Sequence, residues 1–233
     1  MKTFKLTIAL LTLIALLSFT LYSQASKLPL GAFLKVVNSV DKTSNGIDWI
    51  KATTGDPIYA ADQVRTKEKS VAIIKFKKDN SMLRVLPNSV LTMLADKDKR
   101  SRENRIENQG TIGFEIKKLQ NEEFTFKSPT SVASIRGTEG LFDRHNEIDM
   151  LIIKEGLVNL KNLISDKEID VGVGETGLSY PDGNLEKHKS TQDEINAADN
   201  ALKAGDKQME RELKLELKDK NGDKKDLKIK YKE

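Results

Sequence analysis

An arginine and a set of glutamates in the middle of the chain are the residues best suited to chemistry. In one interpretation, Arg136 clamps an anion and Glu139 is a general base. A hydrolase of this kind would draw on Glu115, Glu139 or Glu155. In the other interpretation, Arg136 and Glu139 form a partly buried ion pair that fixes a turn. The stretch Lys127–Phe142 contains no histidine, cysteine or second carboxylate, so the sequence favours the structural interpretation.

Other patterns are too weak to predict a metal ion or a cofactor. His145 and His188 are the only histidines, whereas a metal site needs several ligands at defined spacing. Asp219–Asp226 lacks the frame and closing glutamate of a calcium loop. Gly172–Gly177 has a dinucleotide-type glycine spacing, but no helix or βαβ unit follows. The sequence contains no nucleophile, zinc or phosphate-loop motif, and we expect neither an enzyme nor a cofactor.

The elements that must position these residues are short strands. Side chains alternate along a strand, and no stretch between Gly31 and Gly177 sustains a helical apolar period for three turns. Polar turn residues separate the runs, and many short strands at close spacing predict an all-β sandwich, barrel or solenoid. The predicted strands include Val71–Lys77, Met82–Leu86, Val90–Leu94, Arg105–Lys117, Glu123–Lys127, Ile148–Leu160 (broken at Glu155-Gly156) and Ile169–Val173.

Composition changes after Tyr180. Thr191, with Glu194 three residues on, is a predicted N-cap for a surface helix within residues 191–214. Leu213–Leu217 and Leu227–Tyr231 alternate with charged residues around Asn221-Gly222, which suits a two-residue type I′ turn. We expect this hairpin to present one apolar face, which must pack on its own domain or on a partner.

The N-terminus predicts export. A positive start and the apolar run Ile8–Leu17 precede Ser23-Gln24-Ala25, so we place signal-peptide cleavage after Ala25. An uncleaved membrane anchor is the alternative, and after cleavage we expect no transmembrane span. The predicted organisation is a signal peptide (1–25), a β domain (26–180) and a charged helix and hairpin appendage (181–233).

Composition excludes several classes of protein. There is no cysteine, and hence no disulfide, reactive thiolate or acylated lipoprotein cysteine. The chain has 39 Lys and Arg against 35 Asp and Glu, interspersed, which indicates a solvated surface. The densest basic run, Lys97–Arg105, contains no stacking aromatic residue and is predicted to be a surface loop. We therefore expect no nucleic-acid partner.

Two smaller clusters are assigned structural roles. Trp49, with Ile47 and Ile50, is predicted to anchor the core. Asp62 and Arg65 stand three residues apart and are predicted to stabilise a turn as a pair, with contact to a ligand as the lesser alternative.

The run Pro129-Thr130-x-Val132-Ala133-Ser134-Ile135-Arg136-Gly137-Thr138-Glu139 resembles the signature of the FecR domain. Further landmarks follow in the family's order, and the resemblance spans residues 31–174. They are Trp49, Gly55, Asp62-x-Val64-Arg65-Thr66, Ser70-x-Ala72, Phe76, Asp79-x-Ser81-x-Leu83-Arg84, Pro87-Asn88-Ser89, Gly110-x-Ile112-x-Phe114 and Glu155-Gly156-x-Val158. The resemblance marks as family-signature positions, with structural roles, Asp62, Arg65, Arg84, Pro87, Asn88, Ser134, Arg136, Gly137, Thr138 and Glu139.

This resemblance implies a twisted, solenoid-like or sandwich-like β domain in the cell envelope. In the best-known members, the domain receives a signal from an outer-membrane receptor and controls a sigma factor. We expect neither their cytoplasmic regulatory region, nor a later membrane span, nor their receptor-contact module here, so sigma-factor control is not carried over.

Together these observations predict a periplasmic or otherwise exported, non-catalytic module that binds an envelope protein or a cell-wall glycan in signal sensing. A structural envelope protein that associates with copies of itself is one alternative. A carboxylate-based hydrolase is the other.

Overall fold

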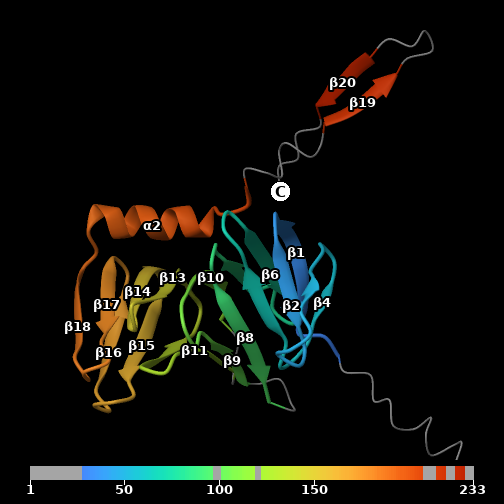
Figure 1. The fold of residues 1–233 in the computed structure, drawn as a ribbon. Coiled ribbons are helices and arrows are strands. Elements are labelled where there is room, and N and C mark those ends of the chain that lie inside the picture. The colour runs from blue at the N-terminus through green and yellow to red at the C-terminus, as the bar shows by residue number, and fades with distance from the viewer. Residues whose placement is uncertain (1–27, 97–100, 119–121, 207–213, 219–223, 229–233) are drawn as a thin grey trace, which may run out of the picture.

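A computed structural model describes residues 28–96, 101–118, 122–206, 214–218 and 224–228, and its strands form two large sheets (Figure 1). The first sheet has the order β18-β17-β14-β13-β10-β7-β6-β1-β4, and the second β16-β15-β12-β11-β9-β8-β5-β2-β3. In the described part of the chain neither sheet closes into a barrel. The all-β prediction is confirmed, and a sandwich describes the architecture well.

The strands of the first sheet are β1 (Gly31–Val37), β4 (Pro57–Ile58), β6 (Val71–Phe76), β7 (Met82–Val85), β10 (Gly110–Ile116), β13 (Thr138–His145), β14 (Ile148–Glu155), β17 (Glu175–Ser179) and β18 (Leu185–Lys189). Those of the second are β2 (Val40–Thr43), β3 (Ile50–Lys51), β5 (Gln63–Thr66), β8 (Val90–Ala95), β9 (Ser101–Arg105), β11 (Glu123–Lys127), β12 (Ser131–Ile135), β15 (Leu157–Asn162) and β16 (Glu168–Gly172).

Each predicted strand has a counterpart, and the predicted break at Glu155-Gly156 separates β14 from β15. Gly156 has φ +88°, and a Cβ atom there would lie 2.6 Å from the carbonyl oxygen of Gly137. Only glycine fits such a backbone position.

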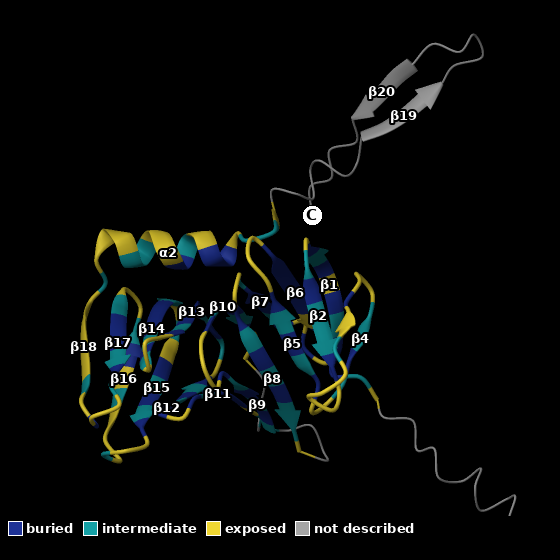
Figure 2. Cartoon of the chain, viewed as in Figure 1, coloured by how far each residue is buried: buried dark blue, intermediate teal, exposed yellow. Residues whose placement is uncertain are grey.

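The core lies between the sheets, and buried residues run along most of the strands of both (Figure 2). Aromatic side chains link the two sheets. Phe124 and Phe126 point to the same face of β11, as their spacing predicts, and both are buried. The ring of Phe124 lies 5.7 Å from that of Phe76, and the ring of Phe126 lies 5.3 Å from that of Phe114 on the opposite sheet. These contacts join the two sheets.

The chain passes repeatedly from one sheet to the other. Strands β6 and β7 belong to the first sheet, β8 and β9 to the second, β10 to the first, and β11 and β12 to the second. Pairs of neighbouring strands are antiparallel, with one exception among the described strands: β9 and β11 run parallel, and β10 between them lies in the first sheet.

The helix α2 (Gln192–Leu202) covers the outer face of the first sheet (Figure 1). Its predicted cap is confirmed: the hydroxyl of Thr191 accepts from the amide of Glu194, whose carboxylate accepts from the amide of Thr191. The helix was predicted to be surface-exposed, but Ala198 and Ala201 are buried against Leu141 and Ile152 while the other side faces solvent. No helix in the described residues is long and apolar enough to cross a membrane.

The predicted C-terminal hairpin is present as β19 (Lys214–Lys218) and β20 (Lys224–Lys228), shifted by one and three residues from the predicted runs. Its register places Leu215 opposite Leu227, so these positions share a face. A two-residue turn at Asn221-Gly222, in unbroken register, would place Leu227 opposite Glu216 instead. The predicted apolar face and the predicted turn were therefore incompatible. The turn itself, like the signal segment 1–25, lies outside the described residues.

Two further predictions are wrong. Residues 101–105 of the basic run form strand β9, with Arg102 and Asn104 buried, where a surface loop was expected. Trp49 is not a core residue: it is half-buried, and its neighbours Ile47 and Ile50 are 79% and 59% exposed. Ile47 precedes β3, and Ile50 is its first residue. Strand β3 is the last strand of the second sheet, and no other described strand pairs with its outer side.

Candidate functional site: a carboxylate row and an open strand edge

The fold brings together the three glutamates that the sequence named as candidate catalytic residues. Glu115 on β10 is opposite Glu139 on β13, and Glu139 is opposite Glu155 on β14. They line a cavity of about 280 Å³ on the outer face of the first sheet. Its remaining walls are Ile116, Lys117, Lys118, Gly137 and Thr138.

Electrostatics favour a proton on the middle carboxylate. Burial raises the pKa of Glu139, and the negative charges of Glu115 and Glu155 raise it further, against the opposing effect of Lys117 and Arg84. Glu115 accepts from Arg84, whose side chain is only 8% exposed. A carboxylate with a raised pKa, such as Glu139, is suited to general acid–base chemistry. Yet no histidine lines the cavity, and no group of metal-binding side chains occurs in the described residues.

The predicted ion pair between Arg136 and Glu139 is not formed. Arg136 is exposed in the turn between β12 and β13, and has no ion-pair partner among the described residues. Gly137 makes that turn with φ +65°, and a Cβ atom there would come within 2.8 Å of the Lys118 side chain. The turn directs Arg136 to solvent, whereas Glu139 already belongs to β13 and faces the other glutamates.

Asp62 and Arg65 are also separated. Asp62 lies just before β5, and Arg65 lies within it. Asp62 is buried and accepts from the amide of Tyr59 at 2.8 Å. Arg65 faces outward, where it binds Asp41 at 2.9 Å and stacks on the Trp49 ring at 4.1 Å.

The remaining signature positions lie in turns and strands of the β domain. Asn88 follows Pro87 in the turn between β7 and β8 and has φ +58°. Ser134 is half-buried in β12, and Thr138 is buried and donates to the carbonyl of Leu157. These observations agree with structural roles, which stay a prediction.

Sequence reasoning missed two buried ion pairs. Arg102 binds Asp79 at 2.6 Å, and Arg144 binds Asp149 at 2.7 Å, with side chains 5% and 4% exposed. Asp149 also accepts from Ser131 at 2.7 Å. Ser101–Arg105 is polar throughout, so its sequence shows no apolar alternation, and the alternating burial of β9 appears only in the structure.

The open edge of the second sheet is the other candidate. Strand β3 pairs on one side only, with β2. Edge strands present unpaired backbone amides and carbonyls, which can pair with another chain. Beside them lie exposed Ile47 and Ile50 and the Trp49 ring held by Arg65. This arrangement can bind an extended peptide with an apolar residue.

Comparisons with known proteins agree with this architecture. Residues 62–159 match the family model described as FecR protein. Two crystal structures of a candidate anti-sigma factor from Parabacteroides distasonis ATCC 8503, at 2.50 and 1.65 Å resolution, are similar with a TM-score of 0.50 and 10% identity. The likeness covers 58% of this chain and 62% or 63% of theirs, less than two thirds, and shows the fold alone. No curated protein matches the chain.

Proposed function

We propose that the chain is a signalling-related module of the cell envelope that binds a partner protein and has no catalytic activity of its own. The match of residues 62–159 to the family model described as FecR protein supports this proposal. The similarity to a candidate anti-sigma factor supports a role in signalling. The repeated passage of strand pairs between the sheets supports the solenoid-like description that the resemblance implies.

The binding surface we propose is the β3 edge, defined as Ile47, Trp49, Ile50 and Lys51. Of the four outer strands of the two large sheets, three are poorly suited to pairing: β18 carries two lysines and a glutamate, β16 carries Glu168 and Asp170, and β4 begins with Pro57, which lacks an amide hydrogen. Charges and proline discourage pairing at an edge. Strand β3 carries one charged residue, Lys51, but it combines an open edge with exposed apolar side chains, which suits recognition by strand addition.

Substitution of Ile50 tests the proposal. Ile50→Lys should leave thermal stability unchanged, because the side chain is 59% exposed, and should reduce crosslinked capture of the envelope partner by about tenfold or more. Val173→Lys is the matched control, since Val173 is 65% exposed beside the β16 edge. Full capture by Ile50→Lys would reject the β3 edge, and loss with Val173→Lys alone would move the interface to β16.

Two other functions give different results. A carboxylate hydrolase acting on cell-wall glycan would release soluble fragments from that polymer, and Glu139→Gln would abolish the release. An envelope protein that associates with itself would increase in measured mass with its own concentration, and Ile50→Lys would leave partner capture intact.

A further inference from the structure

The β3 edge presents the backbone hydrogen-bonding groups of Lys51 to another chain. Val40 accepts from the amide of Ala52 at 2.9 Å, and Lys42 is opposite Ile50 in the antiparallel pairing of β2 with β3. Hydrogen-bonded and non-hydrogen-bonded pairs alternate along an antiparallel ladder, so the amide and carbonyl of Ile50 face β2. Those of Lys51 therefore face away from the sheet, where no described strand pairs with β3.

The two side chains of β3 lie on different faces of the second sheet. Lys42 is opposite both Ile50 and Val64, and Val64 is fully buried, so Ile50 belongs to the inner face. Lys51 is opposite Asp41 and belongs to the outer face. A strand added to this edge would place one side chain beside Ile50 and the next one in its sequence beside Lys51.

The outer face carries an excess of positive charge at this edge. Asp41 binds Arg65 at 2.9 Å and lies 3.6 Å from Lys67. Asp48, in the loop before β3, accepts a hydrogen bond within that loop at 2.8 Å. Lys51 is exposed and has no ion-pair partner among the described residues. Lys51 is therefore available to pair with an acidic side chain from another molecule.

The same lysine disfavours pairing of this edge with a copy of itself. Two identical strands paired antiparallel about a two-fold axis would bring Lys51 of one chain against Lys51 of the other, because Lys51 supplies the outward-facing backbone groups of β3. Like charges directly opposite one another destabilise a strand pair. An acidic residue in that position is favoured instead.

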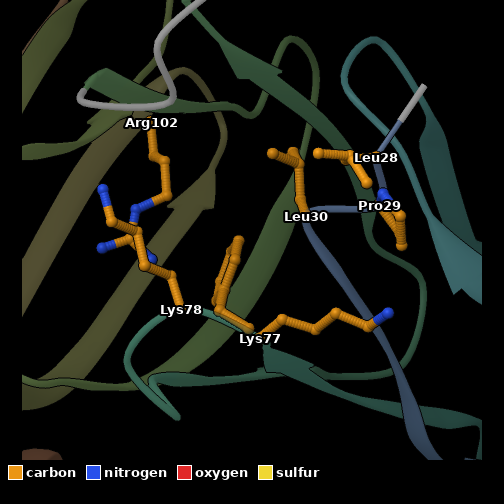
Figure 3. Close-up of a pocket in the computed structure, with 7 residues that line it drawn as sticks. Leu28, Pro29, Leu30, Lys77, Lys78 and Arg102 are labelled. Atoms are coloured by element: carbon orange, nitrogen blue, oxygen red, sulfur yellow. The ribbon is translucent and has the colours of Figure 1, made fainter. Parts of the chain in front are cut away.

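Another opening of the sandwich lacks this arrangement. A cavity of about 300 Å³ beside the segment before β1 is lined by the cations Lys77, Lys78 and Arg102 (Figure 3). Arg102 binds Asp79 at 2.6 Å and Lys78 binds Glu122 at 2.6 Å, so these two charges are balanced. The ammonium of Lys77 points away from Arg102 in Figure 3. Strands β6 and β9, which contribute to this cavity, are each paired on both sides and present no open edge.

We propose that the β3 edge binds an extended segment of the partner protein in which an acidic residue lies opposite Lys51 and a neighbouring residue is apolar. The acidic side chain would pair with Lys51 on the outer face, and the apolar one would lie beside Ile50 on the inner face. Strand addition obtains affinity from main-chain hydrogen bonds and specificity from the alternating side chains. The inference rests on the proposed function, because it names the chemistry of the partner at the same surface.

Fluorescence of Trp49 tests the chemistry of the segment, because Trp49 is the only tryptophan of the chain and belongs to this edge. Short peptides that alternate valine with aspartate should change its emission saturably, and should bind the full chain about tenfold or more tightly than peptides that alternate valine with lysine. Lys51→Gln should keep the emission of the free protein and reduce this preference several-fold. No binding of the aspartate peptide, equal binding of both peptides, or an unchanged preference in Lys51→Gln would overturn the proposal.

Capture of the envelope partner, with a crosslinker that does not react with amines, separates this inference from the function on which it rests. Lys51→Glu should lower capture by about tenfold or more, because it replaces an attraction by a repulsion. Lys77→Glu is the matched control and should capture as the parent does, since Lys77 is also exposed and has no ion-pair partner among the described residues.

The combined results distinguish the two failures. If Ile50→Lys lost capture while Lys51→Glu kept it, the β3 edge would stand and the acidic segment would be rejected. Parent-like capture by both variants would reject the β3 edge itself. An equal loss with Lys77→Glu and Lys51→Glu would reflect the net charge of the chain and would refute a specific role of Lys51.

Discussion

Three arginine side chains are buried in this sandwich. Arg84, Arg102 and Arg144 have side chains 8%, 5% and 4% exposed, and each binds a carboxylate. Although burial raises the pKa of Asp79, hydrogen bonds from Arg102 and Ser81 hold it below its ordinary value. A buried pair of this kind adds little net stability, but removing one partner leaves an uncompensated charge.

Arg102→Ala should therefore lower the free energy of unfolding by about 3–5 kcal/mol, because Asp79 is left buried without its counterion. Arg136→Ala is the matched control: Arg136 is exposed, so the change should stay within about 0.5 kcal/mol. Urea denaturation measures both. Equal effects of the two substitutions would contradict the assignment of which arginine is structural.

The carboxylate row gives a prediction for pH. The pKa of Glu139 is raised in the folded state from its ordinary value of 4.5, so its contribution to stability is full below that pH and is lost as pH rises through the raised value. Glu139→Gln should match the parent at pH 4 and be more stable at pH 7, by less than about 1 kcal/mol since solvent screens the half-buried group. Denaturant titrations at both values provide the measurement.

Glu123→Gln is the control for this experiment, because Glu123 is exposed and the substitution removes the same negative charge as Glu139→Gln. If Glu123→Gln gave the same gain at pH 7, general charge repulsion would explain the effect and the row would have no special role.

At the residue scale, the sequence named three glutamates that the fold brings together, but it singled out an exposed arginine and missed the buried ones. Glu115, Glu139 and Glu155 could be named from residue type. Their alignment depends on the register of the β13–β14 hairpin and on its pairing with β10, which lies further back in the sequence. Arg136 stood out through its motif, whereas Arg102 stood in an all-polar run. Burial of Arg102 follows from which face of β9 meets Phe76 and Phe124, and a single strand's sequence does not reveal its neighbours.

Among the elements, those fixed by local chemistry were predictable. The capping box of α2 and the break at Gly156 each depend on residues within a few positions of one another. Pairings between distant strands were not predictable, nor was the register of β19 with β20, because a shift of one residue exchanges the two faces of a strand.

Helix α2 and the residues after it suggest where the folded unit ends. Lys35 donates to the carbonyl of Gly205 at 2.8 Å, and Asp199 binds Lys154 at 2.9 Å. A chain ending at Tyr180 would expose Leu141 and Ile152, and should lose about 3 kcal/mol or more. A chain ending at Asp206 should keep the parent's stability, as judged by thermal melting.

If the chain ending at Asp206 unfolded, residues 207–233 would be part of the core. If it folded but failed to capture the partner, the C-terminal hairpin would contribute to the interface. Deletion of residues 211–233 distinguishes the same outcomes with the shortest truncation.

For the whole molecule, motif order predicted the match of residues 62–159 to the FecR family model and the all-β class, because landmarks spread over many strands constrain the fold jointly. The predicted boundary at residue 180 rests on a change of composition alone. Strand β18 follows that point and still pairs with β17 in the first sheet. A compositional change marks a change in the environment of side chains and does not mark where backbone pairing ends.

Export is a prediction about the whole chain. Cleavage after Ala25 gives a mature N-terminus at Ser26, because small residues at Ser23 and Ala25 follow the apolar run. Intact-mass measurement of protein recovered from the envelope should show loss of residues 1–25. A species that keeps Met1 would show that the segment is retained as an anchor.

The parallel pair β9 and β11 bears on the order of folding. Strands β8 with β9 and β11 with β12 are hairpin neighbours that can form early from local contacts. The two hairpins are joined by the pairing of β9 with β11. Strand β10, which lies between β9 and β11 in the sequence, belongs to the first sheet and pairs there with β7. Pairing of strands that are separated in the sequence is slow, because the intervening chain loses conformational entropy before the stabilising contacts form. The β9–β11 pair is thus expected to form after the hairpins β8–β9 and β11–β12 on either side of it.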